Sequence, residues 1–256
     1  MNLLIAVILG IVEGLTEFLP ISSTAHLIIS SRLLNIPQTE FQKFFEVFIQ
    51  AGAILSVVFL YFNYAFKNPL LIKKVAASFL PTALVGFLLH KIIKEVFFES
   101  FALIIGSLVV IGLLFIVVEY LIKNKKIELS KTIKNLSWTD ALVIGLGQSL
   151  AVIPGISRAG IVILAMMVKG YRRDEAAVYS FLLAVPTIIA AAGYDLLKTD
   201  FAVLSEPDNI LFLSAGFVVS FITAYISVKW LIGYLKKHSL IPFGVYRILL
   251  VILYYV

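Results

Sequence analysis

EFLPISSTAH, residues 17–26, breaks an apolar N-terminal segment and places one carboxylate, three hydroxyls and an imidazole within ten residues. A second stretch, AVIPGISRAG at residues 151–160, matches it without a gap, so that Pro20 pairs with Pro154. A proline inside a helix removes a hydrogen bond and interrupts the helix. We therefore predict two broken helical segments with polar residues at their breaks, and these breaks decide the fold.

The composition indicates an all-α integral membrane protein. The chain has 256 residues, of which 61% are hydrophobic and only 14% are charged, and its mean hydropathy is +1.04. Apolar blocks such as Phe101–Val118 approach the roughly 20 residues of helix that cross a bilayer. The chain has no cysteine, which excludes disulfides and thiolate metal sites. We expect a multi-pass protein of the cell membrane.

The net charge of +6 comes from lysines and arginines in short loops, which is typical of cytoplasmic loops and not of a nucleic-acid-binding protein. We place the basic loops 67–74, 123–134, 169–173 and 229–238 inside, and the acid-bearing connections 94–100 and 198–208 outside. Six transmembrane helices follow, at about 46–63, 75–92, 101–122, 175–197, 209–231 and 241–256.

The two remaining segments, about 2–35 and 138–168, are predicted to be re-entrant helical hairpins. Segment 138–168 leaves from the inside and returns to the inside, and Pro154 with Gly155 breaks it. Each hairpin is followed by three spans, so the two halves have opposite orientation. We predict one membrane domain over 1–256, built as an inverted-topology repeat of residues 1–122 and 138–256.

Two glutamates precede the first break. Glu13 and Glu17 are four residues apart and share one helix face, where like charges repel. They need a cation, or one of them stays protonated. Carboxylate oxygens suit a hard divalent cation such as Mg²⁺ or Ca²⁺, and we predict that both glutamates bind it. The alternative is one neutral glutamate that is hydrogen-bonded to the main chain.

Three hydroxyls and a histidine follow the first break. Ser22 or Thr24 alone is explained as an N-cap of the next helix. A helix N-terminus is also an anion site, and both residues are candidate substrate-binding residues. His26 lies three residues after Ser23 on the same helix face, so the two are a candidate nucleophile and base.

The second break adds Ser157 and Arg158. An arginine is a bidentate partner for phosphate, and the alternative is an internal salt bridge to Glu13 or Glu17. Together the two breaks offer carboxylates, an imidazole, hydroxyls and a guanidinium, a set that suits a phosphate-bearing ligand with a metal ion. We give little functional weight to Tyr225, Tyr246 and Arg247.

EGLTEFLPISSTAHL with FEVFIQAGAILSVV and PGISRAG closely resembles the BacA/UppP-type undecaprenyl-diphosphatases, and the resemblance covers essentially the whole chain. It implies a membrane phosphatase that converts undecaprenyl diphosphate to undecaprenyl phosphate for cell-wall synthesis and confers bacitracin resistance. It further implies a divalent cation and a site open to the outer face. The residues carried over are Glu13, Glu17, Ser23, Thr24, His26, Ser157 and Arg158. The family usually has glycine where this chain has Ala25, which puts a turn with positive φ at that position in doubt.

We predict that Ser23 attacks the phosphate, with Glu17 or His26 as its base and Arg158 as the anion-binding group. Direct attack by His26 or by a metal-bound water fits the same residues. The substrate is expected to be a polyprenyl diphosphate within the lipid bilayer, and a homodimer is one option for the assembly. The main alternative is a secondary transporter or flippase for an anion, which would not need the Ser/His pair. A structural scaffold leaves the buried charges unexplained.

Overall fold

The computed structural model describes residues 1–97, 100–198, 204 and 206–255, and almost all of them are helical. The described part contains an isolated parallel bridge, between Lys131 and Tyr171, and no longer strand. The α-helices are α1 (Leu3–Thr16), α2 (Ser23–Leu33), α3 (Glu40–Phe66), α4 (Pro69–Ile92), α5 (Phe101–Lys123), α6 (Trp138–Ser149), α7 (Arg158–Val168), α8 (Arg173–Lys198), α9 (Pro207–Leu235) and α10 (Ile241–Tyr255). Shorter turns are the π-helix η1 (Ile93–Phe97) and the 3₁₀ turns η2 (Ile133–Asn135) and η3 (Leu150–Val152).

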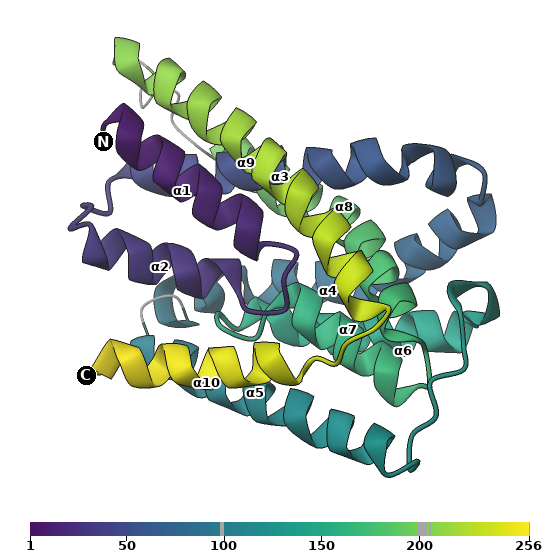
Figure 1. The fold of residues 1–256 in the computed structure, drawn as a ribbon. Coiled ribbons are helices and arrows are strands. Elements are labelled where there is room, and N and C mark those ends of the chain that lie inside the picture. The colour runs from purple at the N-terminus through teal and green to yellow at the C-terminus, as the bar shows by residue number, and fades with distance from the viewer. Residues whose placement is uncertain (98–99, 199–203, 205, 256) are drawn as a thin grey trace.

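Five of these helices are long and apolar enough to cross a membrane: α3, α4, α5, α8 and α9. They contain the first five predicted spans, which confirms a helical, multi-pass architecture. The sixth predicted span, 241–256, corresponds to α10, which has only 15 residues and is shorter than a usual span. Most of the predicted outer connection 198–208 lies outside the described residues. Both chain ends lie on the same side of the molecule (Figure 1).

The two predicted breaks separate short helices that pack against each other. Helices α1 and α2, of 14 and 11 residues, are joined by a turn that contains Pro20. Helices α6 and α7, of 12 and 11 residues, are joined through η3 and a turn that contains Pro154 and Gly155. None of the four reaches the length of about 20 residues that a single crossing requires. Each pair is therefore a helix–turn–helix unit.

The structure corrects the register of the match between the two breaks. Ser22 and Ser157 are the N-caps of α2 and α7, with φ of +75° and +71°. Their hydroxyls accept hydrogen bonds from the main-chain N–H of Ala25 and Gly160 respectively. Ser157 thus corresponds to Ser22 and not to Ser23, because the second turn contains one more residue after its proline. An ungapped match cannot detect this extra residue.

Each broken segment packs on a long helix that lies far from it in sequence. Helix α1 packs on α9 (Figure 1), and α6 packs on α4. Thr223 Oγ1 of α9, which donates to Val219 of its own helix at 2.8 Å, also lies 3.4 Å from the carbonyl oxygen of Gly10, and Thr82 of α4 donates to the carbonyl of Gly145 at 3.2 Å. Gly10 and Gly145 both precede their N-cap serines by twelve residues. The two contacts are therefore equivalent in position.

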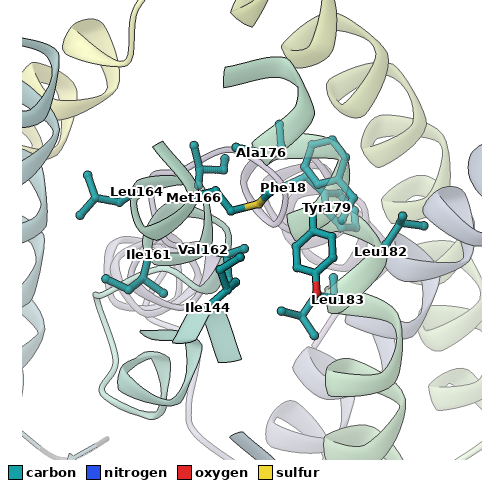
Figure 2. Packing of buried hydrophobic residues seen from close by; sticks show 14 of the residues in the cluster. Phe18, Ile144, Ile161, Val162, Leu164, Met166, Ala176, Tyr179, Leu182 and Leu183 are labelled. Carbon is teal, nitrogen blue, oxygen red and sulfur yellow. The ribbon is translucent and has the colours of Figure 1, made fainter. Parts of the chain in front are cut away.

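The largest hydrophobic core joins the first break to the second helix pair. Phe18, from the turn after α1, is fully buried and packs edge-on against Phe181 of α8 at 5.3 Å between ring centroids. Figure 2 shows Phe18 beside Met166 of α7 and Tyr179 of α8. This core holds the two turns close together in the middle of the bundle.

Candidate active site

Glu17 joins the two turns directly. It is the C-cap residue of α1, and its Oε1 accepts a hydrogen bond from Arg158 Nη2 at 2.5 Å. The Arg158 and Glu17 side chains are only 12% and 8% exposed. Arg158 Nη1 also donates to the carbonyl of Ala184 in α8 at 3.0 Å. The internal salt bridge considered for Arg158 is present, and it is formed with Glu17.

Glu17 also contacts the serine of the first break. Ser23, the first residue of α2, donates its hydroxyl proton to Glu17 Oε2 in a short hydrogen bond. A carboxylate that accepts the proton of a serine hydroxyl is the arrangement of a general base with its nucleophile. One glutamate thus connects a candidate nucleophile to a candidate phosphate-binding arginine.

Arg158 occupies an unusual position for a cation. It is the first residue of α7, where the partial positive charge of the helix N-terminus disfavours another positive charge. The same helix end favours an anion, because its first N–H groups have no partner within the helix. Arg158, Ser157 and the start of α7 therefore form a region that can bind an anion, and Glu17 joins this region to Ser23.

His26 is oriented by different neighbours from those expected. Its Nδ1 lies 2.7 Å from the carbonyl oxygen of Ser22, so Nδ1 carries the proton that is donated. Its Nε2 lies 2.8 Å from the hydroxyl of Tyr246, and the two rings stack at 5.6 Å. Since both ring nitrogens have these partners, the structure favours Glu17 over His26 as the base for Ser23.

Glu13 is the most deeply buried carboxylate of the site. It is 0% exposed, and neither of its oxygens has a hydrogen-bond partner. A buried carboxylate without a partner is costly unless a cation or a proton neutralises it. The described residues contain no cluster of three or more histidine, cysteine or acidic side chains that could hold a metal. The Glu13 carboxylate is therefore available to a proton or to a cation, and a cation held by Glu13 and Glu17 would take its remaining ligands from phosphate and water, as Mg²⁺ commonly does.

The remaining predicted residues lie at the helix starts. Ser22 and Ser157 are buried N-caps, and Thr24 is half-buried in the first turn of α2. Ala25 lies within α2, and the positive φ of this turn falls on Ser22 instead. Alanine at position 25 is therefore compatible with the turn.

Two neighbours of the site, Tyr246 and Arg247, belong to α10, and the sequence alone provides little reason to assign them a function. Tyr246 contacts His26, and the side chain of Arg247 is fully buried next to both turns. A charged residue within an apolar helix is a signal for a functional site in membrane proteins, and Arg247 carries that signal. Tyr246 has no comparable signal, because a tyrosine near a helix end is common at membrane interfaces.

Comparison with known proteins shows the family to which the chain belongs. The family model for bacitracin resistance protein BacA matches residues 6–253. An undecaprenyl-diphosphatase from Sulfurihydrogenibium sp. (strain YO3AOP1) is 49% identical over 257 residues, covering 100% of this chain and 99% of that protein. Undecaprenyl-diphosphatases from Aquifex aeolicus and Wolinella succinogenes are 45% and 44% identical, covering 97% and 99% of this chain and 96% and 97% of their own lengths. The chain belongs to the BacA family of bacitracin resistance proteins.

Proposed function

We propose that this protein hydrolyses undecaprenyl diphosphate to undecaprenyl phosphate and inorganic phosphate. The names of relatives that match over 96–99% of their length support this activity and favour it over transport. The observation that carries the proposal is the position of Glu17, which binds both the Ser23 hydroxyl and the Arg158 guanidinium. The product, undecaprenyl phosphate, would be used again as the lipid carrier in cell-envelope synthesis, and its continued supply would make the cell more resistant to bacitracin.

Ser23 is the proposed nucleophile. Its Oγ forms a bond to the terminal phosphorus while its proton passes to Glu17, and the bond from that phosphorus to the bridging oxygen breaks. Undecaprenyl phosphate leaves with the bridging oxygen. A water molecule then attacks the phosphorus of the phosphoserine; its hydroxide leaves as part of inorganic phosphate, its other proton is released to solvent, and Glu17 returns its proton to Ser23 Oγ as the bond from phosphorus to that oxygen breaks. His26 is not assigned to attack on phosphorus, because both of its ring nitrogens are hydrogen-bonded, to the Ser22 carbonyl and to the Tyr246 hydroxyl.

The phosphate groups are bound where the two short helices begin. Arg158 is the proposed bidentate partner, and Ser22, Thr24 and Ser157 with the first N–H groups of α2 and α7 provide further donors. The Arg158 guanidinium would turn from Glu17 toward the substrate as the diphosphate enters. Preorganised donors of this kind are the main catalytic device in phosphoryl transfer.

Glu13 and Glu17 would hold a divalent cation, Mg²⁺ or Ca²⁺. The support is the Glu13 carboxylate, which is fully buried and has no hydrogen-bond partner. When bound, the cation would neutralise charge on the phosphate oxygens. Glu13 would then serve as a ligand without taking part in proton transfer.

The proposed membrane arrangement consists of six transmembrane helices and two re-entrant hairpins, α1–α2 and α6–α7, in an inverted repeat. The equivalent contacts of Thr223 with Gly10 and of Thr82 with Gly145 support it. Gly112 of α5 and Gly244 of α10 also face each other reciprocally: a Cβ on either one would lie 2.8 or 2.6 Å from the carbonyl of the other. The basic loops set the orientation, with both chain ends and the opening of the site on the outer face.

Phosphate release from purified protein in detergent tests the activity, with C15 and C55 prenyl diphosphates as substrates and with or without EDTA. We expect release that EDTA abolishes and that Ser23→Ala and Arg158→Ala both lose. Arg32→Ala is the matched control, because Arg32 is an exposed arginine on α2 whose described hydrogen bond goes to Tyr254. Folded wild-type protein that binds the lipid phosphate but releases no phosphate would favour a transporter instead.

A further inference from the structure

Arg247 of α10 is completely buried, with a relative exposure of 0%. A buried arginine normally pairs with a carboxylate, because an unpaired charge in an apolar interior is costly. In the described part of the chain, all hydrogen bonds of this guanidinium go to main-chain carbonyl oxygens. Its charge is also 5.8 Å from the ring centroid of Phe115. Arg247 therefore lies outside the ion pair of the site.

The carbonyls that Arg247 binds belong to both turns. Nη1 donates to Pro20 at 3.1 Å, in the first turn. Nη2 donates to Ile156 at 3.2 Å and, in a shorter contact, to Gly155, both in the second turn. Nε donates to Leu108 of α5 at 3.2 Å, which anchors the guanidinium to a long helix. One side chain thus ties together two turns that are separated by more than a hundred residues.

These carbonyls lie immediately before the helices that carry the site. Pro20 precedes the N-cap Ser22 by two residues, and Gly155 and Ile156 directly precede the N-cap Ser157. The position of each carbonyl therefore sets where Ser23 and Arg158 begin their helices. Both N-caps have positive φ, a conformation that a non-glycine residue keeps only when its surroundings hold it.

We propose that Arg247 is a positioning residue for the phosphatase site. It holds the two turns at the spacing that lets Glu17 reach both Ser23 and Arg158. The role needs the fork of five donors, which points in several directions from one plane, and not the positive charge alone. The activity part of this inference rests on the proposed function, whereas the spacing of the turns is independent of it.

Two variants separate the hydrogen-bonding geometry of the guanidinium from its charge: Arg247→Lys keeps the positive charge but loses the planar set of five donors, and Arg247→Gln loses both. Displacement of a reacting group by about 1 Å costs about 10²-fold in rate, so we expect both variants to lose about 10²-fold in kcat while KM changes much less. Arg32→Lys and Arg32→Gln are the matched controls on an exposed arginine. Recovery of kcat in Arg247→Lys would mean that the charge is what matters, and would overturn the positioning role.

A distance measurement tests the spacing directly. The chain has no cysteine, so spin labels can be placed at Leu33→Cys and Val168→Cys, which are 73% and 54% exposed at the far ends of α2 and α7. We expect a narrow distance distribution with Arg247 and a broader or shifted one in both variants, in lipid nanodiscs. An unchanged distribution would overturn the proposal. If the wild type released no phosphate, the proposed function would fail, while this measurement would still decide whether Arg247 holds the turns.

Discussion

Arg158 Nη2 and Glu17 Oε1 lie 2.5 Å apart, although 141 positions separate the two residues in the chain. Both side chains are more than four-fifths buried, so each compensates a charge that water does not reach. Removal of one partner from a buried pair costs about 3–5 kcal/mol, because the other charge remains unpaired. The contact therefore couples the stability of the protein to the assembly of the site.

We expect Glu17→Gln and Arg158→Met each to lower the free energy of unfolding by about 3 kcal/mol, and the double variant to lose less than the sum. Unfolding in mixed micelles of the four proteins measures the coupling. Glu40→Gln is the control, because Glu40 and Lys43 form an exposed pair whose loss should cost less than about 1 kcal/mol. Strict additivity of the two buried substitutions would contradict the coupling.

Ser22 and Ser23 are adjacent, but the structure predicts different effects for them. Ser23→Ala removes the hydroxyl that donates a hydrogen bond to Glu17, so we expect kcat to fall by at least about 10³-fold and the free energy of unfolding to fall by about 1–3 kcal/mol, because a buried carboxylate oxygen loses its donor. Ser22→Gly should keep its stability, because glycine adopts the φ of +75° freely and caps a helix nearly as well, and its kcat should stay close to that of the wild type while loss of the hydroxyl donor raises KM. Ser22→Ala should lose about 1 kcal/mol or more. Kinetics and thermal unfolding of the three variants check the pattern, and a fully active Ser23→Ala would exclude Ser23 as the nucleophile.

The sequence was sufficient to predict the helical class, five of the spans and both breaks, because apolar length and proline act locally. It also grouped Glu17, Ser23 and Arg158, since polar residues are rare in such a chain. It did not predict which base contacts Ser23, because side-chain orientation decides whether Glu17 or His26 is nearer. The role of Arg247 was missed for a related reason: its partners are main-chain carbonyls, which have no signature in a sequence.

Because the Glu13 carboxylate is buried without a hydrogen-bond partner, we expect a bound cation to raise the stability of the folded protein. A cation that binds only the folded state raises the free energy of unfolding by about 2.7 kcal/mol at one hundred times its Kd. We expect Mg²⁺ or Ca²⁺ to raise the Tm of the wild type and of the exposed control Glu40→Gln, and to have little effect on Glu13→Gln. Thermal unfolding with EDTA and with added metal measures this without a substrate. If the Tm of the wild type changed neither with EDTA nor with added metal, the result would contradict the proposed cation site.

The close approach of α1 to α9 depends on the absence of a side chain at Gly14. A Cβ at this position would lie 2.4 Å from the carbonyl oxygen of Ser220, a main-chain atom that cannot move aside. Gly14→Ala should therefore be strongly destabilising. Gly106→Ala is the control in α5, where a Cβ meets nothing within 4 Å, and alanine should there stabilise the helix by up to about 1 kcal/mol. Yields of monodisperse protein and the Tm of the two variants measure the difference, and equal stability of both would contradict the close approach.

Asp140, at the start of the helix pair α6–α7, should make the stability of the folded protein depend on pH in the acid range. It lies in the first turn of α6, accepts a hydrogen bond from the Tyr171 hydroxyl at 2.8 Å and faces Lys169 Nζ at 3.4 Å. Burial raises the pKa of Asp140, but hydrogen bonds from Tyr171, Ser137 and Lys169 and the charge of Lys169 outweigh it, so that the pKa lies below its usual value.

A carboxyl whose pKa is lower in the folded state than in the unfolded state contributes stability above the unfolded pKa, near about 3.9. That contribution is lost as the pH falls through the lower, folded pKa. The Tm of the wild type should therefore exceed that of Asp140→Asn by a constant amount from pH 8 to pH 5, and the difference should shrink below about pH 4. Glu40→Gln, at an exposed site, should show no such difference. A difference that grows toward acid would mean that Asp140 is not held in its charged form by Tyr171 and Lys169.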